Sequence, residues 1–227
     1  MRIFPIILAG GDSSRFDTPK PLAEFDGRTA LELAVGNCEG MERPIVVLGH
    51  RAEEIRRSIP KGARVAINRE WQRGQLSSLL AGLRLVPRGA AFLLYPVDQP
   101  LLTAALVSRL IRAYHKRGPG KSIVMPRKGT RAGHPILCSG ELRSELRRAQ
   151  NAREVVYRDP RRVRYVPVRD AAIWTDFDSP ATYRRCLRLF RRQRQKLTAP
   201  FALANSSCAA IPAESQGYGR QRRDHQR

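Results

Sequence analysis

The chain has 227 residues, of which 42 are Lys or Arg and 20 are Asp or Glu, so its formal net charge is +22. This length suits one α/β domain with a tail, or at most two small domains. No apolar stretch approaches the roughly 18–20 residues of a membrane-spanning helix, so we expect no membrane segment. The charge indicates an anionic partner and leaves nucleotides, nucleic acids and acidic surfaces open.

The order of apolar runs predicts the fold class. Runs bounded by Gly, Pro or charge predict strands at 2–9, 43–49, 63–68, 90–98, 122–126 and 161–168, with 134–139 pairing nearby. The segments 29–35, 51–59, 74–86 and 103–118 have helical spacing. This alternation is typical of a mostly parallel sheet sandwiched by helices, that is, a Rossmann-like α/β fold.

The chain changes character near its C-terminus. Residues 179–196 predict a closing helix, with Ser179 as its N-cap and Pro180 at its first position. We assign residues 1–190 to a single domain and 191–227 to a basic tail. From about Leu197 onward the pattern has no sustained period, so we expect disorder there.

The cysteines and the first residues bear on location. No two of the cysteines form a CxxC pair and no His lies at a metal-ligand spacing, so a zinc site is not expected. They are Cys38, Cys138, Cys186 and Cys208. Reduced thiols are typical of a cytoplasmic protein, which is our expectation. The opening MRIFPIILAGG has too short an apolar run for a signal peptide, and we expect a buried strand there.

The segment LAGGDSSRFDTPKPL joins the first predicted strand to two glycines and two cations. Glycines let backbone N–H groups approach a phosphate, hydroxyls add donors, and Arg and Lys add charge. The residues concerned are Gly10, Gly11, Ser13, Ser14, Arg15 and Lys20. The patterns GxxxxGK[ST] and GxGxxG are absent, and an ordinary turn with solvated charges is the alternative. Pro19 and Pro21 argue against it, because they restrict the backbone around Lys20. The segment therefore predicts a triphosphate site.

Aspartates provide candidate metal ligands. Asp98 ends the buried run 90–98 and so points from the carboxyl end of a strand. Its alternative role is a helix cap, for which Thr103 is the better candidate. Asp176 and Asp178 offer a second carboxylate, although either could be a turn residue ahead of the closing helix. Mg²⁺ takes one or two protein carboxylates, so Asp98 with one of these predicts a magnesium site.

Polar residues after two further predicted strands could contact substrates. Asn68, Gly74, Gln75 and Ser77 lie at the mouth of the strand 63–68, where they could bind ribose or base. The alternative is a polar loop that leads into an amphipathic helix. Arg131 and His134 in TRAGHP could meet a second substrate, although a lone loop His is more often structural or simply exposed.

Several motifs together resemble one enzyme family. LAGGDSSRFDTPKPL is similar to the signature loop of NTP-dependent nucleotidyltransferases, and most similar to LA(A/G)GxSxRMGxxK of the molybdenum-cofactor nucleotidylyltransferases. Asp12 stands where Gly is usual, and Phe16-Asp17 where Met-Gly is usual. The further matching segments, in order, are NREWQRGQLSSLLAGLRLV, YPVDQPLLTAALVSRL, GTRAGHPILCSGEL and TDFDSPATY. The resemblance covers about residues 1–190.

The resemblance implies a reaction and residue roles. An NTP would lie over Leu8, Ala9, Gly10 and Gly11 while Arg15 and Lys20 hold its phosphates as catalytic residues. Mg²⁺ would be bound by Asp98 and Asp176, with Asp178, Arg131 and His134 near the acceptor. A phosphate oxygen of the acceptor would attack the α-phosphorus and release pyrophosphate, with no general base, because a phosphate monoester is already ionised.

The substrates and two other functions stay open. LAGG resembles the guanylyl-transferring branch, which uses GTP, whereas PVDQP, GxRxGHP and DFDSP resemble the cytidylyl-transferring branch. We therefore expect CTP and molybdopterin, with a molybdoenzyme as the recipient of the product. The alternative acceptors are sugar phosphates and phosphorylated alcohols. A hypothesis from another class is nucleic-acid binding through RRCLRLFRRQRQK and RQRRDHQR, although no recognition helix, zinc finger or aromatic RNA platform is recognisable.

Overall fold

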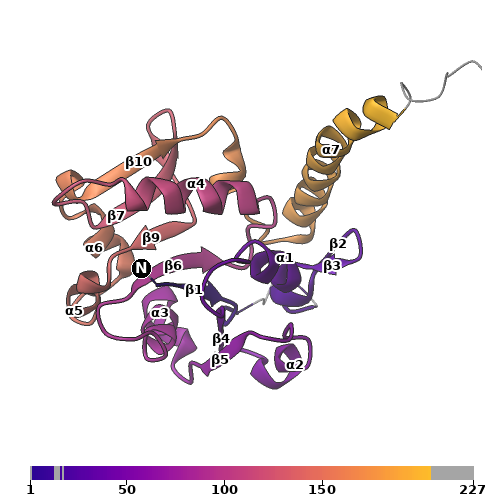
Figure 1. Ribbon diagram of the computed structural model, residues 1–227. Coiled ribbons are helices and arrows are strands. Elements are labelled where there is room, and N and C mark those ends of the chain that lie inside the picture. Colours follow the sequence, from indigo (N-terminus) through magenta and orange to yellow (C-terminus); the bar gives the residue numbers. More distant parts are fainter. Residues whose placement is uncertain (1, 13–15, 17, 206–227) are drawn as a thin grey trace, which may run out of the picture. The chain divides into compact units, whose positions relative to one another are not determined.

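The computed structural model describes residues 2–12, 16 and 18–205 (Figure 1). The chain divides into two units, Met1–Arg191 and Arg192–Arg227. In the second unit the structure describes only the end of the helix α7 (Pro180–Asn205). All of the sheet and every residue of the site below belong to the first unit.

In the described residues the main sheet has eight strands, in the order β10-β7-β9-β6-β1-β4-β5 with β8 paired to β7. They are β1 (Ile3–Leu8), β4 (Ile45–Leu48), β5 (Arg64–Ile67), β6 (Ala91–Pro96), β7 (Ile123–Lys128), β8 (Arg131–Ala132), β9 (Ile136–Cys138) and β10 (Val163–Pro167). β1 pairs in parallel with β4 and β6, as do β4 with β5 and β7 with β10. β9 runs antiparallel between β6 and β7. The sheet is therefore mostly parallel, as predicted.

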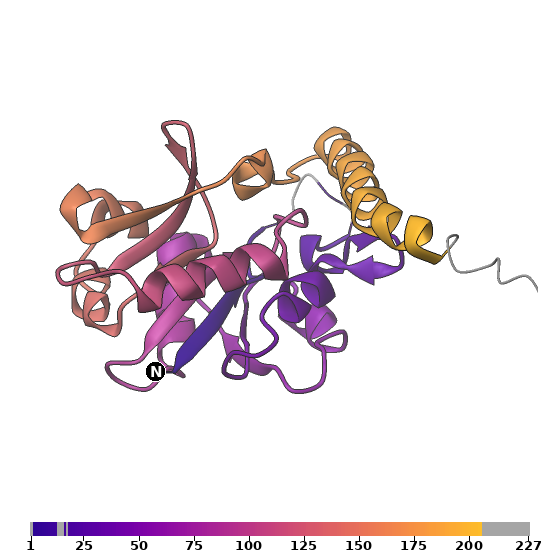
Figure 2. The same cartoon turned by 45° about the horizontal axis from the view of Figure 1, so that its top comes forward.

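Helices cover both faces of this sheet. They are α1 (Ala30–Gly36), α2 (Ala52–Arg56), α3 (Gln75–Leu83), α4 (Ala104–His115), α5 (Arg143–Leu146) and α6 (Ala152–Tyr157), before α7. Alternate residues of β1 enter two separate cores, because successive side chains of a strand point to opposite faces. Ile7 packs in the core that includes residues of α1 and α4, and Ile6 in the core under α3, α5 and α6. Figure 2 shows α4 lying across one face of the sheet.

Short 3-10 helices and one hairpin complete the first unit. The 3-10 helices are η1 (Lys20–Leu22), η2 (Trp71–Arg73), η3 (Gly140–Leu142), η4 (Pro160–Arg162) and η5 (Ala171–Trp174). The hairpin pairs β2 (Glu24–Phe25) with β3 (Arg28–Thr29). Its turn places Asp26 and Gly27 at φ of 50° and 79°, the backbone that an Asp-Gly pair favours. The sequence contained this hairpin signal, but our predicted elements did not include it.

The helix starts follow the expected capping chemistry. Thr103 Oγ1 accepts a hydrogen bond from the Leu106 backbone N–H at the start of α4, which confirms Thr103 as the cap there. Ser179 Oγ accepts from the Thr182 backbone N–H at the start of α7. α6 was not predicted, although Asn151 caps it through the Glu154 backbone N–H.

The C-terminal prediction needs a correction. We expected no regular structure from about Leu197, but α7 continues to Asn205. The segment 197–205 contains the strong helix formers Leu and Ala, although Pro200 has no backbone N–H to donate within the helix. Residues 206–227 lie outside the described residues.

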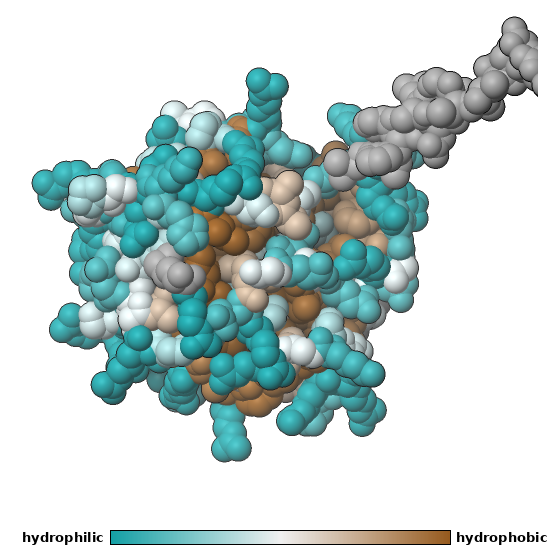
Figure 3. All heavy atoms as spheres, in the orientation of Figure 1, coloured by the Kyte–Doolittle hydropathy of each residue, from teal (hydrophilic) through white to brown (hydrophobic). Residues whose placement is uncertain are grey.

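Three cysteines, Cys38, Cys138 and Cys186, are free and buried, and burial raises the pKa of the Cys38 and Cys138 thiols to about 12. Cys208 lies outside the described residues. Over the described part of the chain, no helix is both long and apolar enough to span a bilayer. Hydrophilic side chains cover most of the face in Figure 3, with hydrophobic atoms visible towards its middle.

Candidate active site

The glycine loop follows β1 and packs directly on the loop that follows β4. Ala9 donates its backbone N–H to Val47 O at 2.9 Å, and His50 donates to Gly10 O at 3.1 Å. A Cβ added to Gly10 would lie 2.7 Å from the backbone nitrogen of Gly49, whereas one added to Gly11 would meet nothing within 4 Å. The close backbone packing therefore requires a glycine at position 10, a reason that the sequence did not reveal.

Lys20 reaches the end of the neighbouring strand β6. The side chain starts from η1, between Pro19 and the buried Pro21. Its Nζ lies 3.7 Å from Asp98 Oδ2 and also forms an ion pair with Asp178 Oδ1. The lysine is 16% exposed, so these contacts lie in a partly desolvated place. The sequence analysis assigned Lys20 to the phosphates and Asp98 to the metal, and the structure brings these two residues together at one rim of the sheet.

An aromatic cluster brings the C-terminal motif to this rim. Phe16 packs edge-on against Phe177 and Tyr183, with ring centroids 5.8 and 5.5 Å apart. Phe25 packs against the same two rings. Phe16, which departs from the Met of the family pattern, thus has a packing role. The cluster holds the backbone on both sides of Phe177, and so positions Asp176 and Asp178.

Asp98 lies close enough to Lys20, Asp176 and Asp178 for their charges to act on it. Burial is the largest cause that raises the pKa of Asp98, Lys20 opposes the rise, and the carboxylates of Asp176 and Asp178 add to it. Ionisation of Asp98 is therefore less favourable than that of a solvent-exposed aspartate, and a further cation beside it would favour ionisation. Among the described residues, no group of three or more Asp, Glu, His or Cys side chains is arranged as a ready metal cage. One or two carboxylates suit Mg²⁺, which keeps its remaining positions for water and phosphate.

A pocket of about 360 Å³, here called the loop pocket, lies against the glycine loop. Seven of the predicted nucleotide-binding residues line it, namely Leu8, Ala9, Gly10, Gly11, Lys20, Gly74 and Gln75, together with Asp98. Asp12, Trp71, Gln72 and Ser78 also line it and were not predicted. Ser78 lies three residues after Gln75, on the same face of α3, which is a signal that the sequence contained. Ser13, Ser14 and Arg15 lie outside the described residues.

Two predicted residues do not line the loop pocket. Asn68 Nδ2 donates to Ser77 Oγ at 2.8 Å and to Ser78 Oγ at 3.0 Å, while Asn68 Oδ1 accepts from the Glu70 backbone. Ser77 Oγ donates to Gly74 O. Both residues line a different hollow, together with Leu76, Leu80 and Arg84 of α3 and its C-terminal end. The structure therefore places Asn68 in a hydrogen-bonded loop that leads into α3 and Ser77 in the first turn of that helix, the alternative that the sequence left open.

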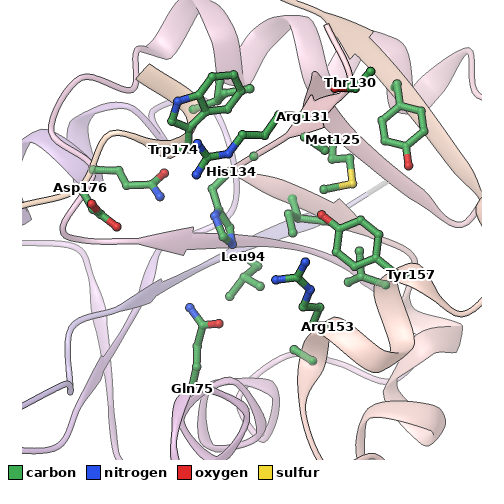
Figure 4. Close-up of a pocket in the computed structure, with 18 residues that line it drawn as sticks. Gln75, Leu94, Met125, Thr130, Arg131, His134, Arg153, Tyr157, Trp174 and Asp176 are labelled. Atoms are coloured by element: carbon green, nitrogen blue, oxygen red, sulfur yellow. The ribbon is translucent and has the colours of Figure 1, made fainter. Parts of the chain in front are cut away.

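A second space of about 660 Å³, here called the large cavity, opens beside the loop pocket (Figure 4). Gln75 lines both spaces, so they adjoin. Arg131, His134 and Asp176 line the large cavity, whereas Asp178 lines neither space. Most other lining side chains are aromatic, apolar or cationic, and they include Leu94, Met125, Arg153, Val156, Tyr157, Tyr165, Ile173 and Trp174. No local sequence pattern indicated most of these residues, because they come from separate elements.

The cationic and imidazole groups of the large cavity have defined settings. The Arg131 guanidinium lies over the Trp174 ring, 4.7 Å from its centroid, which holds the cation without neutralising it. Burial lowers the pKa of His134 to about 4, so the imidazole is neutral near pH 7. A Cβ added to Gly133 would lie 2.1 Å from Ile173 O, and His134 donates its backbone N–H to that oxygen at 2.8 Å. The glycine of the TRAGHP motif thus lets this loop pack on η5.

Residues 5–166 match the family model described as "MobA-like NTP transferase domain". The chain belongs to this family. It is accordingly an enzyme of the nucleotidyltransferase type, with the mostly parallel sheet and flanking helices of its structural neighbours.

The MobA-like domain is also similar to individual proteins. It is 32% identical over 152 residues to nicotine blue oxidoreductase of Paenarthrobacter nicotinovorans, which covers 61% of this chain and 71% of that protein. Rv0371c of Mycobacterium tuberculosis H37Rv, solved in complex with manganese, is 28% identical with a TM-score of 0.68, and the match covers 83% of this chain and 99% of that one. Molybdopterin-guanine dinucleotide biosynthesis protein A of Archaeoglobus fulgidus has the same fold at 16% identity, with a TM-score of 0.65 and coverage of 83% and 99%. Several other curated relatives are longer, and this MobA-like chain spans only 28% to 50% of their length.

Proposed function

We propose that this chain transfers CMP from CTP to the phosphate of molybdopterin and releases pyrophosphate. The observation that carries the proposal is the convergence of Lys20 with Asp98, at 3.7 Å, and with Asp178 on the rim beside the glycine loop. A lysine and carboxylates at the carboxyl ends of parallel strands suit a polyphosphate and its cation. The product would pass to a molybdoenzyme, and the reaction would take place in the cytoplasm.

The loop pocket would hold the nucleotide. The backbone of Leu8 to Gly11 would lie under the base and ribose, with Gln75 and Ser78 available as hydrogen-bonding groups. Lys20 would place its ammonium against the α- and β-phosphates, with Arg15 as a second cation. A lysine already held by carboxylates is preorganised, so it stabilises the charge that builds up as the α-phosphorus is attacked.

The carboxylates fit a divalent cation. Burial first, and then the negative charges of Asp176 and Asp178, raise the pKa of Asp98, and carboxylate oxygens are the hard ligands that Mg²⁺ and Mn²⁺ prefer. Asp98 and Asp176 would hold Mg²⁺, while Asp178 keeps Lys20 in place. When bound, the metal would neutralise charge on the phosphate oxygens. The manganese complex of Rv0371c supports a divalent metal in this fold.

The large cavity would hold the acceptor. Its volume of about 660 Å³ exceeds that of the loop pocket, and several aromatic and apolar side chains form part of its wall. Such a wall favours a flat ring system over a polyhydroxylated sugar. Arg131 would contact the anionic part of the acceptor. Because the acceptor phosphate is already ionised and His134 is a weak base, no general base takes part.

A screen for pyrophosphate release tests the proposal. Purified protein with Mg²⁺ would be offered molybdopterin or a set of sugar phosphates, each crossed with CTP, GTP, ATP and UTP. We expect release only with molybdopterin, and most rapidly with CTP. Release only with a sugar phosphate would replace the acceptor and keep the reaction class.

Two further measurements in the same screen test for an oxidoreductase and for nucleic-acid binding. Because one relative is named an oxidoreductase, NADH and NADPH oxidation is followed with the same acceptors. Salt-sensitive binding of DNA or RNA is measured in parallel, because the net charge is +22. Cofactor oxidation or tight nucleic-acid binding, without pyrophosphate from any pair of substrates, would refute the proposal.

A further inference from the structure

A buried amide on the wall of the large cavity has an oxygen without a hydrogen-bond partner. Gln99 is 6% exposed and lines this cavity, and its Oε1 has no partner within the described part of the chain. One other buried side-chain atom in that part is in the same state, Nε of Arg143. The other nitrogens of that guanidinium donate to Leu83 O and Val86 O, so its group is mostly satisfied. Gln99 has no such compensation.

Gln99 also lies at the boundary between the two spaces. It directly follows Asp98, which lines the loop pocket, whereas Gln99 lines the large cavity. The side chains of these consecutive residues therefore face different substrates in the proposed reaction. Gln75, which lines both spaces, marks the same boundary from α3.

We infer that Gln99 is a specificity-determining residue for the acceptor, whose N–H or O–H group donates a hydrogen bond to the Gln99 amide oxygen. The inference rests on the proposed function. Rotation about the last side-chain torsion exchanges the amide oxygen and nitrogen, so the oxygen can be turned toward a ligand. A site with an unpaired buried acceptor discriminates strongly against molecules that lack the matching donor. The aromatic side chains of the large cavity favour acceptors that contain a ring. Gln99 favours, among these, acceptors that carry an N–H or O–H group where it meets the amide oxygen.

In the ligand-free protein the unpartnered oxygen of Gln99 destabilises the folded state. The inference therefore predicts an effect on thermal stability as well as on binding. Gln99→Met keeps the length of the side chain and removes the unpartnered oxygen. We expect the midpoint of thermal unfolding to stay the same or rise, because a buried polar group without a partner destabilises the folded state. A residue with a merely structural role would show the reverse.

Direct binding provides the test. Wild type, Gln99→Met and Gln99→Asn would be titrated with molybdopterin and with glucose 1-phosphate, and separately with CTP, by tryptophan fluorescence. We expect the dissociation constant for molybdopterin to rise at least about tenfold in Gln99→Met and less in Gln99→Asn, which keeps an amide. The dissociation constant for CTP should not change. In turnover, the acceptor KM should rise while kcat changes little.

A matched substitution controls for the loss of an amide as such. Gln150 is exposed and lines neither the loop pocket nor the large cavity. Gln150→Met should therefore leave acceptor binding, CTP binding and the unfolding midpoint unchanged.

The outcomes separate this inference from the proposed function. Weaker acceptor binding by Gln99→Met together with an undiminished unfolding midpoint supports it, even if no pair of substrates releases pyrophosphate. Equal acceptor binding by wild type and Gln99→Met overturns it, even if pyrophosphate release with molybdopterin is robust. A lower unfolding midpoint for Gln99→Met, or no binding of either acceptor by wild type, also overturns it.

Discussion

The loop pocket and the large cavity adjoin, but different kinds of groups build them. On its glycine-loop side the loop pocket is formed by backbone and small residues, and Gly10 lies so close to Gly49 that no side chain fits between them. The large cavity is formed by long and aromatic side chains from β7, β10, α6 and η5. Tightly packed backbone preserves one shape, whereas side chains can be exchanged one at a time. The comparison indicates a fixed nucleotide site beside an adaptable acceptor site.

Removing the Asp98 carboxylate should have the largest effect on turnover. Asp98→Asn is expected to lower kcat about a thousandfold or more, because Asp98 is the proposed metal ligand nearest Lys20. Burial and like charges raise the pKa of Asp98, so its ionisation opposes folding as pH rises through the unfolded-state pKa. The unfolding midpoint at pH 7 should therefore stay the same or increase. Steady-state kinetics and calorimetry measure both, and full activity in Asp98→Asn would rule out this metal site.

Lys20→Ala should have the second largest effect on turnover. We expect kcat to fall roughly a hundredfold, with a smaller change in NTP affinity, because the lysine acts mainly on the charge of the transition state. Pre-steady-state turnover and a separate NTP titration distinguish the two effects. Equal losses in kcat and in NTP affinity would contradict this division of roles.

A pair of glycine substitutions tests whether backbone packing fixes the loop pocket. Gly10→Ala would place its Cβ 2.7 Å from the Gly49 nitrogen, so we expect a loss of about 2 kcal/mol of unfolding free energy. Gly11→Ala is the matched control, since a Cβ there meets nothing within 4 Å. Denaturant unfolding measures both variants. Equal stability of the two variants would contradict the interpretation that close backbone packing determines the shape of the loop pocket.

The smallest expected effect concerns His134 in the large cavity. Its folded-state pKa of about 4 lies below the usual value of 6.5, so the folded state favours the neutral form. The stability that this provides is present above pH 6.5 and is lost as pH falls toward 4. Between pH 7 and pH 5.5 we expect a loss of about 1 kcal/mol in unfolding free energy. His134→Gln should remove this part of the pH dependence, and an unchanged pH profile in that variant would contradict the assignment.

The sequence predicted the fold and the loop pocket better than the large cavity, for a physical reason. The strands and most helices could be predicted from local patterns, and Lys20 and Asp98 lie at strand ends that a parallel sheet brings together. Asn68 and Ser77 were predicted near the nucleotide from their proximity along the chain, but they do not line the loop pocket. Proximity along the chain does not reveal which way a side chain points. Residues such as Tyr157 and Trp174 meet only through tertiary packing, so no spacing in the sequence indicates them.

The backbone contact between Gly10 and Gly49 has a consequence for redesigning this enzyme. No substitution at either position can retune the choice of base without first separating two strands of the sheet, because a Cβ on Gly49 would lie 2.5 Å from Gly10 O. A search for altered nucleotide preference is therefore best confined to the opposite wall, where Gln72, Gln75 and Ser78 project from η2 and α3. A library at Gln72 and Gln75 would explore new hydrogen-bond patterns without disturbing the contact between Gly10 and Gly49, whereas Ser78 also accepts a hydrogen bond from Asn68.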